Sequence, residues 1–211
     1  MSKDYSQELV KEIQSVLEDQ GWKFSFDEEN GMFKFGTKLE SKIRSISYYI
    51  SVRSDAYVVY AVSPISADAD DENMMVNMAM FICSANYGLK AGNFELDLND
   101  GEIRFKVFVN CTGTVPSHDI IKSSVIVPAI SFDTYGDGIV NVIYNNASGK
   151  AEAERCENSR IDGIQRRFRA ALQNSGASAD ESARLEEFLS FLQERMGSAD
   201  SASNEDDSEN K

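Results

Sequence analysis

The chain has little of the chemistry on which enzymes and metal sites depend. Its 211 residues include one histidine, His118, and three cysteines, Cys83, Cys111 and Cys156, with no C-x-x-C pair among them. A catalytic triad or a multi-histidine metal site would have to be built around that single imidazole. Scattered cysteines are typical of reduced thiols inside a cell. We therefore expect no catalytic residues, no metal site and no cofactor.

Long apolar runs and positive charge are also scarce. No stretch of about 18 apolar residues is present to cross a bilayer, and residues 1–10 lack the apolar core of a secretory signal. Lysine and arginine total 21 against 35 acidic residues, which gives a formal net charge of −14 and a pI near 4.5. Nucleic-acid binding depends on clustered Lys and Arg that release counterions. We therefore expect a cytoplasmic protein that binds neither nucleic acid nor a membrane.

The composition that is present is that of a globular protein, with 42% hydrophobic and 27% charged residues. Apolar residues at helical spacing between residues 5 and 20 predict an amphipathic helix, and Gly21 ends it. Over residues 22–52, apolar and polar residues alternate in three runs, and a fourth run, residues 56–62, is rich in Val and Tyr; turn signals separate the runs. This pattern predicts two hairpins.

A second helix and a third hairpin follow. Four acids within residues 66–73 lead into an apolar helical pattern, so this helix begins near Glu72. Residues 94–98 and 103–109 alternate around the tight-turn signal Asn99-Asp100-Gly101. The periodicities point one face of each element into a common core that contains Trp22, Phe24, Phe81, Ile82, Phe94, Phe105 and Val107.

The order of these elements predicts the fold class. A helix, two hairpins, a helix, a third hairpin and then further helices make an α+β protein, with an antiparallel sheet of three hairpins backed by helices. Ser117 is the expected N-cap of the helix after the last strand, and Pro128 either kinks that helix or starts its next segment. We assign residues 1–146 to the α+β domain, 147–196 to a C-terminal helical extension and 197–211 to a disordered acidic tail.

The stretch from Asn86 to Phe105, NYGLKAGNFELDLNDGEIRF, resembles the signature of the YbjN family of bacterial proteins. Gly21-Trp22 after the first helix and residues 132–137, FDTYGD, support the resemblance, which covers residues 5–146. That family is described as sensory transduction regulators and shares the fold of type III secretion chaperones. The resemblance implies a compact sheet backed by helices, often dimeric, that binds protein segments or regulates by contact.

We therefore expect a non-enzymatic, chaperone-like or regulatory protein-binding domain of the bacterial cytosol. Its partner is another protein or a second copy of this chain, and a homodimer through an edge strand or a helix face is the simplest arrangement. Methionine adapts to irregular partners, and aromatic residues are enriched in binding cores. The candidate binding residues are Met74, Met75, Met78, Met80, Tyr49, Tyr57 and Tyr87. The alternative for the first three methionines is packing of their helix onto the sheet.

Two other functions stay open. The C-terminal helices could be an oligomerisation element in a structural module without a client. An enzyme would need Cys111 and His118, or Asp133 and Asp137, to meet in a cleft. The two aspartates are four residues apart and would share one helix face, where they could bind a divalent ion or act as an acid/base pair, and a capping or solvated role is the simpler interpretation.

Three further patterns resemble ligand sites. Residues 31–38 have the glycine spacing of a phosphate-binding loop but alternate like a strand. The acids that start at Asp68 resemble a calcium loop, but Asn73 and Ala79 stand where the loop needs Gly and Glu, so we interpret them as acids that lead a helix. A basic cluster is either a solvated helix face or a site for an anionic partner, and it consists of Arg166, Arg167 and Arg169.

Overall fold

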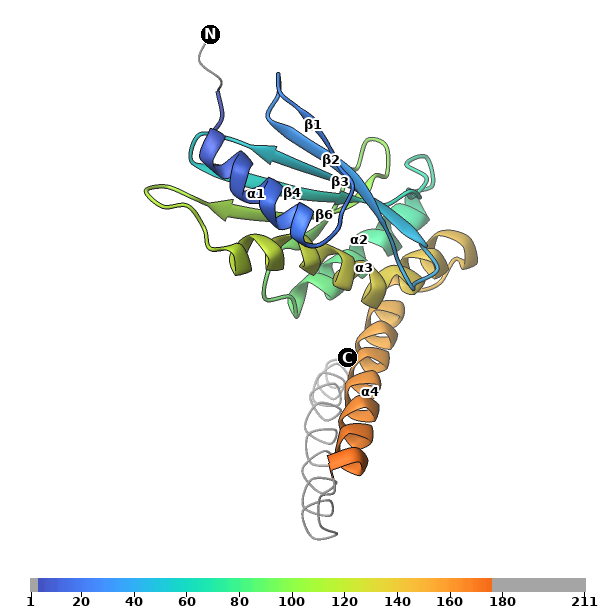
Figure 1. The fold of residues 1–211 in the computed structure, drawn as a ribbon. Coiled ribbons are helices and arrows are strands. Elements are labelled where there is room, and N and C mark those ends of the chain that lie inside the picture. Colours follow the sequence, from blue (N-terminus) through green and yellow to red (C-terminus); the bar gives the residue numbers. More distant parts are fainter. Residues whose placement is uncertain (1–3, 176–211) are drawn as a thin grey trace, which may run out of the picture. The chain divides into compact units, whose positions relative to one another are not determined.

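The structure is a computed structural model that describes residues 4–175 (Figure 1). Four helices are present in this part: α1 (Gln7–Asp19), α2 (Glu72–Tyr87), α3 (His118–Asn145) and α4 (Gly149–Ser175). Six strands are present: β1 (Ser25–Asp27), β2 (Met32–Lys38), β3 (Ser45–Val52), β4 (Ala56–Val62), β5 (Asn93–Leu96) and β6 (Ile103–Asn110). Their order along the chain confirms the prediction of a helix, two hairpins, a helix, a third hairpin and further helices.

All six strands form one antiparallel sheet with the order β1-β2-β3-β4-β6-β5. The three predicted hairpins are β1–β2, β3–β4 and β5–β6, so the α+β fold class is confirmed. β2 also pairs with β3, and β4 pairs with β6 rather than with β5. This strand order depends on contacts between distant segments and was not part of the prediction.

One face of the sheet is buried beneath helices. The register places Phe33 opposite Ile50, Ile50 opposite Val59, and Val59 opposite Val107, and all four side chains are buried. Helices α1, α2 and α3 contribute their apolar faces to the same core. Five predicted core residues are buried, namely Phe81, Ile82, Phe94, Phe105 and Val107, while Trp22 and Phe24 are half-buried against the cluster.

Pro128 lies inside α3 and does not end it, because residues on both sides of it remain helical. Proline has no backbone N–H, so the carbonyl of Ser124 lacks its usual helical donor. The buried hydroxyl of Tyr48 donates to the carbonyl of Val125 at 2.8 Å, and the hydroxyl of Tyr57 lies 3.0 Å from Ser124 Oγ. These two inward tyrosines therefore attach the proline-containing turn of α3 to the sheet.

The loop between β2 and β3 is held on α3 by two carboxylates. Asp133 Oδ1 accepts hydrogen bonds from the backbone N–H groups of Glu40 at 2.8 Å and Ser41 at 3.1 Å. Asp137 Oδ1 accepts from the N–H of Lys42 at 2.8 Å. Loops need partners for their backbone donors, and these carboxylates supply them. The capping role within the simpler interpretation of the aspartate pair is therefore confirmed.

The first turns of α4 belong to the same compact unit as the sheet. Residues 1–158 form this unit, and the chain from Ser159 onward belongs to a second. Ala153 and Cys156 on α4 are buried, and the N–H of Gly149 donates to Asn77 Oδ1 of α2 at 3.2 Å. The predicted second half of the helical extension and the acidic tail, residues 176–211, lie outside the described residues.

Candidate functional site

Helices α1, α2 and α3 all lie on one side of the sheet, so the outward side chains on the other side form a separate surface. Cross-strand pairs run along it from Lys34 to Tyr49, from Tyr49 to Tyr60, and from Tyr60 to Lys106. We call this surface the open face and define it by the outward residues Met32, Lys34, Lys38, Tyr49, Val58, Tyr60, Val62, Arg104, Lys106 and Phe108.

The centre of the open face is apolar and aromatic. Phe108 is 60% exposed and pairs across the strands with Val58, while Tyr49 is 36% exposed and pairs with Tyr60. An antiparallel sheet with one solvated face usually carries polar side chains there. A contiguous apolar patch on such a face indicates an interaction surface.

The sequence contains a signal for Phe108, although this residue is not among the candidate binding residues named from the sequence. In β6, the inward residues Ile103, Phe105, Val107 and Val109 establish the period of two, and Phe108 is an apolar residue in the opposite phase. Strand β4, AYVVYAV, is apolar in both phases. Apolar residues in both phases of neighbouring strands predict that both faces of the sheet are apolar.

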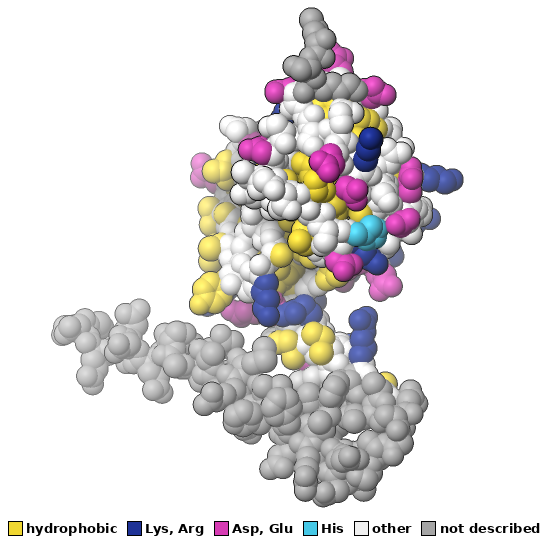
Figure 2. All heavy atoms as spheres, turned by 60° about the vertical axis from the view of Figure 1, so that its left-hand side comes forward, with side chains coloured by type: hydrophobic (Ala, Val, Ile, Leu, Met, Phe, Trp, Pro, Cys, Tyr) yellow, Lys and Arg dark blue, Asp and Glu magenta, His cyan; other side chains and the backbone are white. Residues whose placement is uncertain are grey.

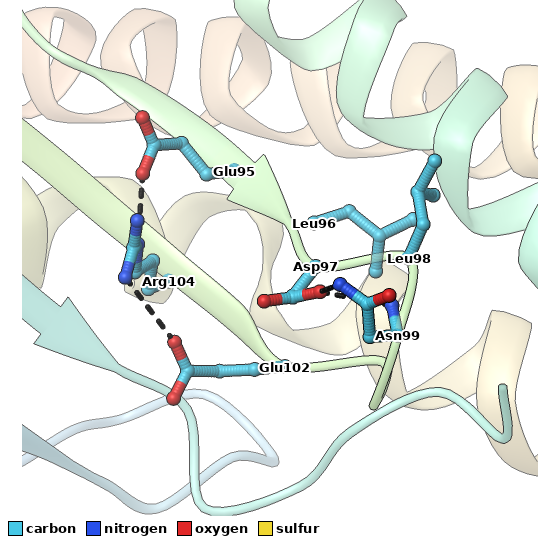
Figure 3. Close-up of a pocket in the computed structure, with 7 residues that line it drawn as sticks. All are labelled: Glu95, Leu96, Asp97, Leu98, Asn99, Glu102 and Arg104. Carbon is cyan, nitrogen blue, oxygen red and sulfur yellow. Dashed lines mark hydrogen bonds and ion pairs between the residues drawn. The ribbon is translucent and has the colours of Figure 1, made fainter.

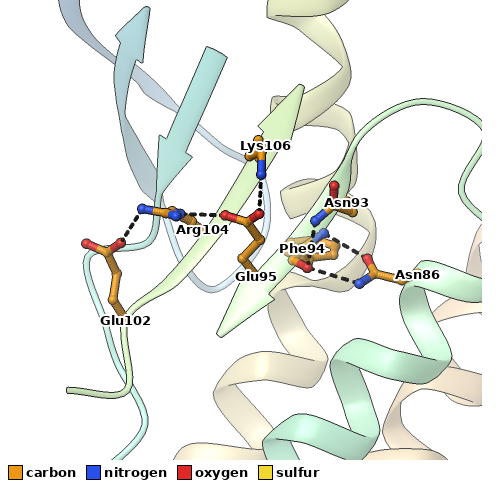
Figure 4. Close-up of polar contacts among 7 residues, drawn as sticks. All are labelled: Asn86, Asn93, Phe94, Glu95, Glu102, Arg104 and Lys106. Atoms are coloured by element: carbon orange, nitrogen blue, oxygen red, sulfur yellow. Dashed lines mark hydrogen bonds and ion pairs between the residues drawn. The ribbon is translucent and has the colours of Figure 1, made fainter. Parts of the chain in front are cut away.

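A cluster of charges lies at one side of the open face (Figure 4). The carboxylate of Glu95 on β5 is 2.8 Å from Arg104 Nε and 2.7 Å from Lys106 Nζ. Burial opposes ionisation of Glu95, but the hydrogen bonds from Lys106 and Arg104 outweigh it and lower the pKa of this carboxyl. The guanidinium of Arg104 also lies 4.8 Å from the ring centroid of Tyr60, so a cation–π contact joins the charged cluster to the aromatic centre.

The turn between β5 and β6 encloses a hollow beside this cluster (Figure 3). Asp97 Oδ1 accepts hydrogen bonds from both the backbone N–H and the side-chain amide of Asn99 at 2.8 Å. These bonds shape the turn and lower the pKa of Asp97. The hollow is lined by Glu95, Leu96, Asp97, Leu98, Asn99, Glu102 and Arg104, and its polar groups serve the turn and the cluster around Arg104.

Asn86 covers the outer edge of β5 (Figure 4). Its Oδ1 accepts from the backbone N–H of Phe94 at 2.8 Å, and its Nδ2 donates to the carbonyl of Phe94 at 3.0 Å. An edge strand with unpaired backbone groups is a template for pairing with another chain. Because the side chain of Asn86 satisfies both groups, a partner has better access to the open face than to this edge.

The residues predicted to bind are divided between core and surface. Tyr57 is fully buried and so is not accessible to a partner as a binding residue must be, because the register puts it on the inward side of the sheet with Val59. Tyr49 does lie on the open face, whereas Tyr87 is 97% exposed at the end of α2. The methionines do not form one surface: Met78 is buried, Met74 and Met75 are half-buried against the core, and Met80 is exposed.

The structure does not unite Cys111 with His118. Cys111 is buried and its thiol donates to the carbonyl of Val109 at 3.5 Å, and burial raises the pKa of this thiol. His118 Nε2 lies 3.0 Å from Asp19 Oδ2 at the surface. Among the described residues, no hydrogen bond joins this cysteine to this histidine.

The other ligand-like patterns have structural roles. The side chain of Asp71 caps α2 by accepting from the N–H of Met74 at 3.0 Å, and residues 32–38 form β2. Arg166 and Arg167 are exposed on α4, and the side chain of Arg169 lies outside the described part. Within residues 4–175, no group of three or more His, Cys, Asp or Glu side chains is placed to hold a metal ion. No helix in that range is long and apolar enough to span a bilayer.

No protein-family model matches the chain, and a search of curated proteins found no match. The geometry of the open face is therefore the main evidence on which a function can be argued.

Proposed function

We propose that this protein is a non-enzymatic protein-binding module of the bacterial cytosol, chaperone-like or regulatory, that engages its partner through the open face. The observation that carries this proposal is the exposed apolar centre of that face, above all Phe108. Phe108 is 60% exposed and lies beside Val58, Tyr60 and Tyr49 on neighbouring strands, and a contiguous apolar patch of this kind is typical of an interaction surface.

Two further points support a binding role. The stretch from Asn86 to Phe105 resembles the signature of the YbjN family, whose members are described as regulators. The two side chains that an enzyme would most plausibly use, Cys111 and His118, are each engaged elsewhere, by Val109 and Asp19. A buried thiol with a raised pKa is a poor nucleophile at neutral pH.

The test compares proteins captured from a bacterial lysate by the full chain and by a Tyr49→Ser, Phe108→Ser double variant. The matched control is Ile130→Ser, because Ile130 is also exposed, at 58%, but lies on α3. We expect the parent and the control to retain the same partners and the double variant to lose them. Capture that is unchanged in the double variant would refute the proposal, provided that circular dichroism shows all three proteins folded.

A second copy of the chain is one partner that such a face could bind, since a two-fold axis allows the same patch to be used on both subunits. Sedimentation of the same three proteins at micromolar concentration tests this case. Self-association of the parent and of Ile130→Ser, together with a monomeric double variant, would identify the partner as the chain itself.

A further inference from the structure

The open face differs in charge from the rest of the chain. The whole sequence carries a net charge of −14, and acidic side chains are scattered over the face of the molecule that Figure 2 shows. The outward side chains of the six strands nevertheless include four cations, Lys34, Lys38, Arg104 and Lys106, against two acids, Asp27 and Glu95. The sheet therefore presents a locally positive surface on an acidic protein.

The cations on the two sides of the face differ in how they are neutralised. Arg104 and Lys106 share one carboxylate, Glu95, and Arg104 has a second, more distant carboxylate in Glu102 at 3.6 Å. On the other side, Lys34 is exposed and forms no ion pair with any residue in the range 4–175. Net positive charge thus remains on the side of the aromatic centre that carries Lys34 and Lys38, where Asp27 is the one outward acid, whereas Arg104 and Lys106 on the other side are balanced by Glu95 and Glu102.

The spacing of the lysines and tyrosines on the open face limits which peptide segments can bind there. Lys34, Tyr49, Tyr60 and Lys106 form one row across β2, β3, β4 and β6. Neighbouring strands are about 4.8 Å apart, so the two lysines flank the tyrosine rings at roughly 14 Å from each other. A bound segment with apolar side chains over the rings would place its flanking side chains beside the lysines.

We infer that the partner segment is acidic: a peptide in which aromatic or aliphatic side chains alternate with carboxylates. This inference rests on the proposed function and names the chemistry of its partner. Complementary charge at the rim of an apolar contact accelerates association and selects against partners of the wrong sign. The alternative ligand for a face of aromatics and cations is single-stranded nucleic acid, but the net charge of −14 repels a phosphate backbone.

The test measures fluorescence anisotropy of labelled synthetic peptides with the full chain. The probe alternates Glu with Phe, and the comparison peptides carry Gln or Lys in place of Glu. We expect the Glu peptide to bind about tenfold more tightly than the Gln peptide, the Lys peptide to bind least, and the preference to fade with added salt. The variant Lys34→Gln, Lys38→Gln should lose most of the preference for Glu, whereas Lys11→Gln, on α1 at the opposite side of the sheet, should keep it.

Three other results of the peptide experiment would contradict the acidic partner. Equal, salt-insensitive binding of the Glu and Gln peptides would overturn the acidic partner and leave the proposed protein-binding function standing. Failure of every peptide to bind would overturn the acidic partner segment, while the capture experiment with the Tyr49→Ser, Phe108→Ser variant decides separately on the protein-binding function. Tighter binding of a single-stranded oligonucleotide than of the Glu peptide, with the same dependence on Lys34 and Lys38, would overturn the inference in favour of nucleic acid.

Discussion

Removal of the Asn86 side chain should destabilise the protein by uncapping the edge of the sheet. In the native fold, this side chain satisfies both the N–H and the carbonyl of Phe94, the residue that links β5 to the core through its buried ring. Asn86→Ala removes both bonds. The alanine that replaces Asn86 in α2 has a higher helix propensity than asparagine, so the substitution does not weaken the helix itself. Any loss of stability therefore reports the cap and not the helix.

The two lost bonds are unequal. The carbonyl of Phe94 keeps a second donor, Asn93 Nδ2 at 3.2 Å, whereas the N–H of Phe94 bonds at 2.8 Å to Asn86 alone in the described part of the chain. A half-buried amide without a partner costs about 1–3 kcal/mol, and the carbonyl adds little because it stays bonded. We expect the free energy of unfolding to fall by about 1–3 kcal/mol, which corresponds to roughly 2–4 °C in Tm for each kcal/mol in a chain of this size.

Urea denaturation followed by circular dichroism measures this loss directly. The matched control is Asn158→Ala, because Asn158 is exposed and its side chain has no hydrogen bond within residues 4–175. The control should lie within about 0.5 kcal/mol of the parent. A loss of that small size for Asn86→Ala as well would show that water replaces the cap at no cost and that the edge of β5 is not protected by Asn86.

Three further substitutions test the core, a turn and the buried tyrosines. Phe105→Ala should cost about 3–5 kcal/mol in urea denaturation, because the ring is fully buried, and a loss below about 1 kcal/mol would mean that β6 faces the other way. Gly101→Ala should lower the free energy of unfolding clearly more than Gly21→Ala. Both glycines have a positive φ, at +72° and +69°, but only at Gly101 would a Cβ lie 2.0 Å from the carbonyl oxygen of Ala67. Equal losses in the two variants would contradict the packing of that turn. Burial raises the pKa of Tyr57 to about 12, whereas an unfolded tyrosine titrates near 10, so its contribution to stability is complete below about pH 10 and is lost as the pH rises towards 12. Tyr57→Phe should therefore flatten the fall in stability between pH 10 and 12, and an unchanged slope would argue against a buried hydroxyl.

Local signals in the sequence predicted the elements well. The acids before Glu72, Gly21 after the first helix and Asn99-Asp100-Gly101 between two alternating runs each act within a few residues, and the structure confirms the elements that they delimit. The strand order could not be predicted in the same way. The pairing of β4 with β6 joins residues that are 42 positions apart at Val62 and Arg104 and 54 positions apart at Ala56 and Asn110, and no local pattern in the sequence specifies a contact over such a distance.

The candidate site was predicted only in part, for two physical reasons. Strand β4 is apolar in both phases, so its sequence does not indicate whether Tyr57 or Tyr60 points inward. The register with β3 and β6 determines which of the two tyrosines is buried. The roles of Asp133 and Asp137 were similarly open, because their partners are backbone amides more than ninety residues earlier. The four-residue spacing predicted that the two carboxylates share one helix face, but it could not identify the backbone N–H groups that they bind.

The tyrosines of β3 and β4 differ in environment according to the face of the sheet on which they lie. Tyr48 and Tyr57 point inward, where burial of a hydroxyl is costly unless it is bonded, and α3 supplies Val125 and Ser124 as partners. Burial raises the pKa of both hydroxyls, so they remain neutral donors across the physiological range. Tyr49, the next residue along β3, points to the open face, on the side of the sheet away from α1, α2 and α3. The inward tyrosines thus help to join the sheet to α3, whereas the aromatic residues of the open face make no such bond to α3 and are the residues on which the proposed binding role depends.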